Sequence, residues 1–176
     1  TPNKYYTEQD VGVLRFPMVV PMPIMASSFS GEVCVKNYLT STGSKVYRPN
    51  HLKLSEPLMA KIKDGRIKAL DGPSKVKDDF EQHYEFVSEK FNIDKYCVHS
   101  WHAGIHPGIK YEQSIADNPD RWSNTIFASP KFLHFHTCGN YPPGEICWMI
   151  ENPTISIDTT PLWDNGVLKI RDFIPT

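Results

Sequence analysis

"PLMAKIKDGRIKALDGPSKVKDDFEQHYEFVSEKFN", residues 57–92, contains the two clearest local elements of this chain. In its first half, apolar and polar residues alternate on both sides of Asp64-Gly65. That dipeptide favours a two-residue β-turn, so the pattern predicts a β-hairpin. The expected facing pairs are Ile62 with Ile67 and Ala60 with Ala69.

The second half of the same stretch predicts a helix. Its apolar residues recur every three or four positions, which is typical of an amphipathic helix. They are Val76, Phe80, Tyr84, Val87 and Phe91. Ser74 stands where an N-cap is expected, and the apolar stripe is expected to pack on a sheet.

Most other segments favour β-strands. They are "GEVCVKNYL" (31–39), "YCVHSWHAGIHPG" (96–108), "EICWMI" (145–150), "TISID" (154–158) and "PLWDNGVLKI" (161–170). The last contains Asn165-Gly166, which favours a second hairpin. One main helix among many strands predicts an α+β fold with a mixed or antiparallel sheet. We expect a single domain over residues 1–176, with a metal site at a strand end.

Composition excludes several classes of function. The 176 residues are 40% apolar and 22% charged, as in an ordinary globular protein. A net charge of −1, from 19 basic and 20 acidic residues, predicts no nucleic-acid partner. No apolar run approaches the roughly 20 residues of a membrane helix, so no membrane partner is expected. The four cysteines show no CxxC spacing, which favours a reduced, cytoplasmic protein.

The strongest functional signal is a group of histidines. His134 and His136 alternate in "FLHFHTCG", and alternate residues of a strand share a face roughly 6.5–7 Å apart. If the loop holding His102 lies beside them, three imidazoles and Glu145 can surround one metal ion. Such a set suits iron(II), zinc, manganese or copper. The alternative is that these are partly buried histidines satisfied by the backbone or water.

Other residues near this group have expected roles of their own. His106 or His99 could act as acid or base, because a histidine pKa lies near neutral pH. By strand alternation, His99 is expected to point away from His102. Thiolate ligands are not expected, although Cys138 and Cys147 are close in sequence.

The order of several motifs resembles the C-terminal half of the aminopeptidase T superfamily. Within that superfamily the chain is most similar to the branch of the 2,5-dihydroxypyridine 5,6-dioxygenases, over roughly residues 12–170. The motifs are "FSGEV" (29–33), "LSEPLMAKIKDGRIKALDG" (54–72), "SWHAGIHPG" (100–108), "FLHFHTCG" (132–139) and "NPTISIDTTPLWDNGVL" (152–168).

The resemblance implies particular metal ligands. His102 matches a histidine ligand of the dioxygenase branch, and Glu32 matches an acid that is a metal ligand in the aminopeptidases. The branch's His-x-Asp pair falls here on Glu145-Ile146-Cys147, so the usual second histidine and carboxylate are absent. We expect His134 and His136 to stand in for them, which gives a rebuilt set of His102, His134, His136 and Glu145.

Three functions remain open on these grounds. The first is a mononuclear iron(II) dioxygenase acting on a small hydroxylated aromatic or heteroaromatic substrate. The second is a metallo-aminopeptidase-like hydrolase that uses zinc, manganese or cobalt, with Glu32 and Glu145 as ligands. The third is a non-catalytic subunit or binding module whose metal site has decayed.

A partner is also expected. The family chain is about twice as long, and the first residue here is Thr1, so we expect a processed piece or part of a longer protein. Apolar residues between 16 and 25 have no local helix to cover them: Met18, Val19, Val20, Met22, Ile24 and Met25. A homo-oligomer, or a partner chain that supplies the missing N-terminal half, would cover such a patch.

Overall fold

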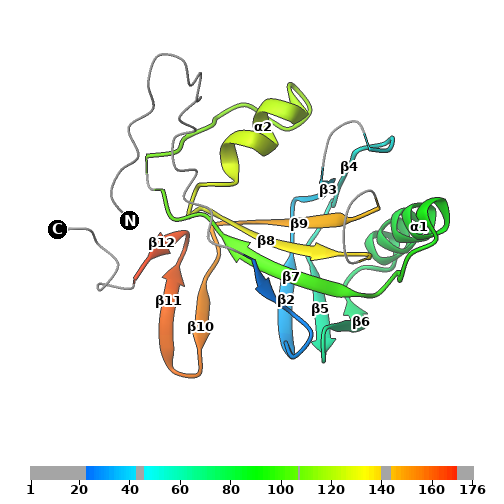
Figure 1. The fold of residues 1–176 in the computed structure, drawn as a ribbon, viewed down its shortest axis with the longest axis horizontal. Coiled ribbons are helices and arrows are strands. Elements are labelled where there is room, and N and C mark those ends of the chain that lie inside the picture. The colour runs from blue at the N-terminus through cyan, green and yellow to red at the C-terminus, as the bar shows by residue number, and fades with distance from the viewer. Residues whose placement is uncertain (1–22, 43–45, 107, 140–143, 170–176) are drawn as a thin grey trace, which may run out of the picture.

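The chain has an α+β fold with antiparallel strands and one main helix (Figure 1). The structure is a computed structural model and describes residues 23–42, 46–106, 108–139 and 144–169. The strands are β1 (Ile24–Met25), β2 (Gly31–Val35), β3 (Tyr38–Ser41), β4 (His51–Lys53), β5 (Leu58–Lys63), β6 (Arg66–Asp71), β7 (Val98–Ala103), β8 (Phe132–Thr137), β9 (Ile146–Glu151), β10 (Ile155–Ile157), β11 (Thr160–Asp164) and β12 (Val167–Leu168). The helices are α1 (Ser74–Phe91) and α2 (Pro119–Ile126).

The described strands form one large sheet and two small ones. The large sheet has six strands in the order β1-β7-β8-β9-β3-β4. The strands β2-β5-β6 and β10-β11-β12 form the two three-stranded sheets. Each pairing among the described strands is antiparallel.

The hairpin predicted around Asp64-Gly65 is confirmed as β5-β6. Asp64 and Gly65 have φ values of 48° and 65°, as a two-residue turn with both central residues at positive φ requires. Ile62 pairs with Ile67, as expected. The second expected pair is wrong, because the register shifts after Lys61 and places Ala60 opposite Leu70. An irregularity of this kind cannot be read from alternation alone.

Helix α1 packs its predicted stripe into the core. Val76, Phe80, Tyr84 and Val87 are buried. The indole Nε1 of Trp148 in β9 donates a hydrogen bond to the Tyr84 hydroxyl over 2.6 Å. Ser74 is the first helical residue rather than the N-cap, which is Pro73. The helix therefore begins one residue earlier than the capping pattern suggested.

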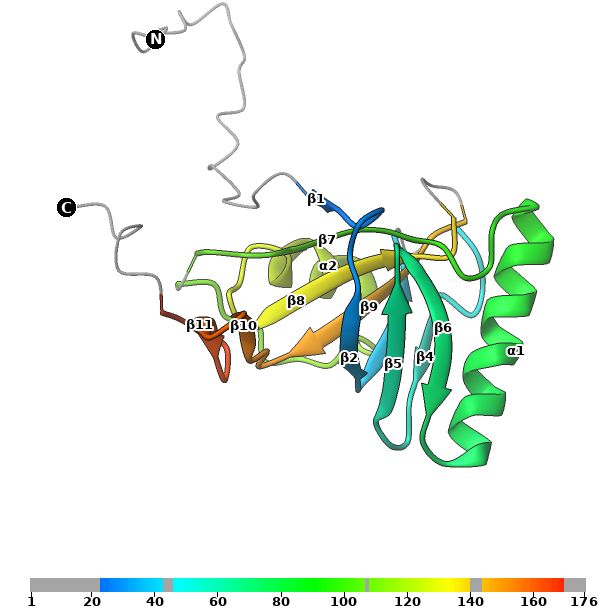
Figure 2. The same ribbon diagram turned by 90° about the horizontal axis from the view of Figure 1, so that it is seen from below.

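The two faces of the large sheet have different surroundings. One face carries Leu39, Phe135 and Trp148, which belong to the main core with α1 and the sheet of β2, β5 and β6. Figure 2 shows α1 beside β6 at one end of the molecule. The other face carries the histidines, and the segment containing α2 covers it. Successive residues of β8 therefore face alternately the main core and the segment containing α2.

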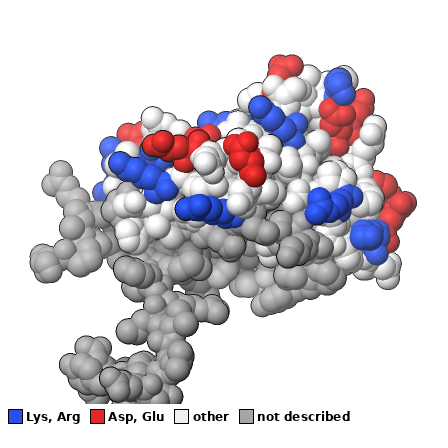
Figure 3. All heavy atoms as spheres, turned by 90° about the horizontal axis from the view of Figure 1, so that it is seen from above, with Lys and Arg blue, Asp and Glu red and all other residues white. Residues whose placement is uncertain are grey.

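The surface of the described residues mixes charge and apolar side chains. On the face drawn in Figure 3, lysine and arginine side chains lie among aspartates and glutamates. In the described part of the chain, neither helix could cross a membrane. Ile24 and Met25 are 53% and 57% exposed, in agreement with the expected apolar patch. Its other members, Met18, Val19, Val20 and Met22, lie outside the described residues.

Candidate metal centre

Three histidines converge on the face of the sheet covered by the α2 segment. Antiparallel pairing of β7 and β8 places His102 directly opposite His134. The ring centre of His102 lies 5.0 Å from that of His134 and 5.1 Å from that of His136. The prediction that His134 and His136 share a face is therefore confirmed, with Phe135 on the opposite face. His102 lies on strand β7 rather than in a loop.

Glu145 joins these imidazoles from the residue before β9. Its Oε1 lies 3.1 Å from Nδ1 of His136, and Nε2 of His136 lies 2.9 Å from Nε2 of His102. The Thr42 hydroxyl donates a hydrogen bond to Oε2 of Glu145. We call His102, His134, His136 and Glu145 the histidine cluster. Short polar contacts join His102, His136 and Glu145, and the His134 ring lies beside that of His102.

The histidine cluster is shielded from solvent. His134 is fully buried, and the other three residues are at most 8% exposed. Both ring nitrogens of His134 and Nδ1 of His102 have no hydrogen-bond partner among the described residues. Buried polar atoms are nearly always paired in proteins, so unpaired nitrogens call for a ligand or water. This is the observation that best fits a bound ion.

Burial and mutual contact set the protonation of the histidine cluster. Burial, together with the neighbouring His136, lowers the pKa of His102 to about 4. Burial also holds the pKa of His134 well below its usual value. Burial opposes a charge on His136, but Cys147 and Glu145 together raise its pKa to about 10. Without an ion, His136 is thus the protonated partner of Glu145, and the imidazoles of His102 and His134 are neutral.

A thiol lies next to the histidine cluster. Cys147 is opposite His136 in the β8-β9 ladder, and its Sγ is 3.4 Å from Nδ1 of His136. Among the described residues, His136, Glu145 and Cys147 are the group whose ligand atoms all lie within 4.8 Å of one another and could hold an ion. The sequence argument did not expect a thiolate here. Pairing of β8 with β9 is what brings the sulfur to the imidazole.

Two other predicted residues lie apart from the cluster. Glu32 is on β2, where its exposed carboxylate lies 3.5 Å from Nζ of Lys61. His106 follows β7, and its Nδ1 accepts a hydrogen bond from the backbone of Gly108. The structure brings neither side chain to the histidine cluster.

His99 lies at an irregularity in β7. Val98 pairs with Thr137 and Ser100 with His136, so β7 holds one extra residue at His99. Such a bulge breaks the alternation that would direct His99 away from His102. His99 helps to lower the pKa of Glu145, together with hydrogen bonds from His136 and Thr42 that outweigh burial. The bulge therefore removes the basis for the expected orientation, which stays a prediction.

An aromatic residue after α2 covers the histidine cluster. The Phe127 ring lies 4.3 Å from the ring of His134 and 5.6 Å from that of His102. The covering segment approaches β7 closely, since a Cβ on Gly104 would lie 2.0 Å from the Ala128 carbonyl carbon. Only glycine permits that contact. Sequence analysis missed Phe127 and Thr42, because no local pattern connects residues 42, 102 and 127.

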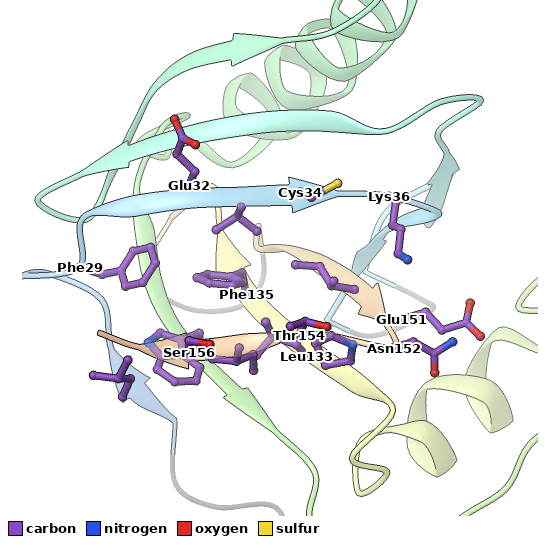
Figure 4. Close-up of a pocket in the computed structure, with 16 residues that line it drawn as sticks. Phe29, Glu32, Cys34, Lys36, Leu133, Phe135, Glu151, Asn152, Thr154 and Ser156 are labelled. Carbon is purple, nitrogen blue, oxygen red and sulfur yellow. The ribbon is translucent and has the colours of Figure 1, made fainter. Parts of the chain in front are cut away.

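A cavity of about 480 Å³ lies on the opposite face of the sheet. Figure 4 shows Phe29 and Phe135 facing one another in it, with Glu32 directed away from these rings. The Phe29 and Phe135 ring centres are 5.6 Å apart. Since Phe135 separates His134 from His136 in sequence, the thickness of β8 lies between this cavity and the histidine cluster.

These features define an α+β domain with a buried, histidine-rich candidate metal centre. Its fold is similar to that of 2,5-dihydroxypyridine dioxygenase from Pseudomonas putida KT2440, with a TM-score of 0.56 and 16% sequence identity. The match covers 83% of this chain and 42% of that chain, so this chain spans about two fifths of that enzyme's length. No protein-family model and no curated protein sequence matches. The likeness shows the fold, and membership of the aminopeptidase T superfamily stays a prediction.

Proposed function

We propose that this protein is a mononuclear metal-dependent enzyme, an iron(II) dioxygenase acting on a small hydroxylated aromatic or heteroaromatic substrate. The observation that carries the proposal is the convergence of His102, His134 and His136, in which Nδ1 of His102 and both ring nitrogens of His134 lack a hydrogen-bond partner among the described residues. Imidazole and carboxylate ligands suit iron(II) and zinc, which supports a redox or Lewis-acid site. The fold likeness to a dioxygenase favours iron(II) among these.

The described residues have distinct parts in this proposal. The three imidazoles and Glu145 hold the ion, and Phe127 excludes water from the side of His134 and His102. Iron(II) in the site would supply Lewis acidity and one-electron redox chemistry. His99, the bulge residue of β7, is our candidate to hold or release a proton. His106, the other candidate from the sequence for that role, lies apart from the histidine cluster and supports it less well.

A metallo-aminopeptidase-like hydrolase is supported less well. That function would use Glu32 as a ligand, and Glu32 is exposed on β2 with Lys61 as its ion-pair partner. A binding module with a decayed metal site is the third candidate. The contact between His136 and Glu145 favours it, because the two side chains can satisfy one another without an ion.

Metal analysis of protein purified without chelators tests the proposal. We expect near-stoichiometric iron under anaerobic purification, whereas zinc, manganese or cobalt would favour the hydrolase and absence of metal the decayed site. His134→Ala and His136→Ala should lose the ion yet keep the fold, because the large core provides most of the stability. His51→Ala is the matched control, since His51 lies on the edge strand β4 outside the histidine cluster. Equal metal loss in all three variants would contradict the proposal.

We also propose that the chain works with a second copy or with a partner chain that supplies the N-terminal half. Support comes from exposed Ile24 and Met25 on the edge strand β1 and from exposed Ile157. The four free cysteines fit a reducing compartment such as the cytoplasm. Light scattering on the purified chain is the test, and a monomer of 20.1 kDa with full activity would contradict a partner.

A further inference from the structure

We propose that the cavity on the face of the large sheet opposite the histidine cluster binds a small aromatic carboxylate. The thickness of β8 separates this cavity from the histidine cluster, so the inference does not depend on a metal ion. Three features carry it. They are the walls that enclose the cavity, a row of aromatic rings inside it, and a lysine at one end that has no ion-pair partner among the described residues.

The shape of the cavity suits a small molecule. Its volume is about 480 Å³, which lies within the range of about 300–1,000 Å³ that is usual for small-molecule sites. The floor is the large sheet, and its side chains are Trp101, Leu133, Phe135 and Ile150. The two walls are β2 and β10, each the outermost strand of its own small sheet, and Figure 4 shows Cys34 of β2 and Ser156 of β10 on opposite sides of Phe135. A hollow with a floor and two walls favours a small molecule over the flat surface of another protein.

Aromatic rings form a row inside the cavity. The centre of the Phe135 ring lies 5.6 Å from that of Phe29, edge to face, and 6.2 Å from that of Trp101, at an interplanar angle of 26°. A further ring with its centre roughly 4.5–7 Å away would extend such a row favourably. Ile157 at the rim is 56% exposed, so an apolar ligand would also cover this side chain. The lining therefore favours a flat aromatic body.

The two acidic residues of the lining already have partners. Glu32 points away from the aromatic rings, and its carboxylate lies 3.5 Å from Nζ of Lys61 (Figure 4). Oε2 of Glu151 accepts a hydrogen bond from Nδ2 of Asn37 over 3.0 Å. Neither carboxylate depends on a ligand for a counterpart.

Lys36 provides the charge that a ligand would complement. It is half-buried, and its ammonium has no ion-pair partner in the described part of the chain. Figure 4 shows Lys36 extending from the end of β2 toward the side of Asn152, at the end of the cavity away from Phe29. Asn152 and the hydroxyl of Thr154 can donate further hydrogen bonds there. The ligand that fits has an aromatic body at the Phe29 end and a carboxylate at the Lys36 end.

Calorimetric titration of the whole chain with naphthoate tests the site. Naphthalenemethanol has the same rings without the charge, and decanoate has the charge without the rings. We expect naphthoate to bind about 5-fold more tightly than naphthalenemethanol, because one partly exposed ion pair is worth up to about 1 kcal/mol. It should bind about 2–10-fold more tightly than decanoate, because ring–ring contacts add to the burial of apolar area.

Two charge variants test the part played by Lys36. Lys36→Met should weaken naphthoate binding by about 5-fold and leave naphthalenemethanol binding unchanged. Lys53→Met is the matched control, since Lys53 lies on the edge strand β4 outside the cavity, and it should change neither affinity.

Three size and shape variants test the location. Ser156→Trp should fill the cavity and abolish binding of both aromatic probes, whereas Thr159→Trp, in the turn between β10 and β11, should not. Phe29→Leu keeps an apolar side chain but removes one ring of the row, so it should weaken naphthoate and not decanoate. Circular dichroism of each variant confirms that the fold is retained.

Each alternative outcome contradicts a defined part of the inference. Equal affinity for decanoate and naphthoate would overturn the aromatic class, and equal affinity for naphthalenemethanol and naphthoate would overturn the role of Lys36. Undiminished binding in folded Ser156→Trp protein, or no naphthoate binding to the wild type at millimolar concentration, would overturn the site. These results leave the metal content untouched, so the proposed function stands or falls separately.

Discussion

Replacing His134 with leucine should raise stability and abolish metal binding in the same variant. His134 is fully buried, and its one donor and one acceptor nitrogen both lack partners among the described residues. Each unpaired group costs about 1–3 kcal/mol in the ion-free protein. Leucine is of similar volume and removes both costs, while its imperfect packing destabilises the protein by up to about 1.5 kcal/mol.

The expected net gain is about 0.5–6 kcal/mol in the free energy of unfolding of the ion-free protein. For a chain of this length, that corresponds to a rise in melting temperature of roughly 1–24 °C. Thermal unfolding in the presence of chelator measures the gain, and equilibrium dialysis with zinc measures binding. A residue kept at the expense of stability is characteristic of a functional site.

His83→Leu is the matched control. His83 is another buried histidine, with an unpaired Nε2, and it lies on α1 against Tyr47, outside the histidine cluster. We expect it to stabilise the protein by about 1 kcal/mol and to leave zinc binding unchanged. The reasoning is refuted if His134→Leu lowers the melting temperature, or if it binds zinc as tightly as the control does.

Three further changes should have measurable effects on stability. Burial lowers the pKa of His83 to about 4, so on acidification the unfolded state takes up a proton near pH 6.5, before the native state does. The free energy of unfolding should therefore fall by about 3 kcal/mol from pH 6.5 to 4 through this residue. Urea titrations of His83→Leu over this pH range should show a smaller fall. Gly65→Ala should lower the free energy of unfolding by about 1–3 kcal/mol, since Gly65 has φ +65° and an added Cβ would lie 2.6 Å from a backbone oxygen. Gly31→Ala is the control and should change the urea midpoint little. Tyr84→Phe leaves the buried Trp148 Nε1–H without its acceptor and should cost about 1–3 kcal/mol by the same assay; an unchanged midpoint would show that another group accepts this bond.

Local sequence determined the elements whose stability is local. The Asp64-Gly65 turn, the apolar stripe of α1 and the Asn165-Gly166 turn are each specified by neighbouring residues, and each occurs where expected. The shared face of His134 and His136 also follows from the two-residue period of a strand. These features could be predicted because backbone geometry relates residues a few positions apart.

Tertiary structure decided which distant residues meet. Strand order places β7 and β9 on either side of β8, and this brings His102, Glu145 and Cys147 to the same imidazole. The bulge at His99 depends on pairing across strands, so alternation within β7 could not foresee it. The entropy cost of bringing distant segments together is offset by the packing of the whole sheet rather than by any one segment. A sequence pattern can therefore name candidate ligands, but register and strand order select the partners of each.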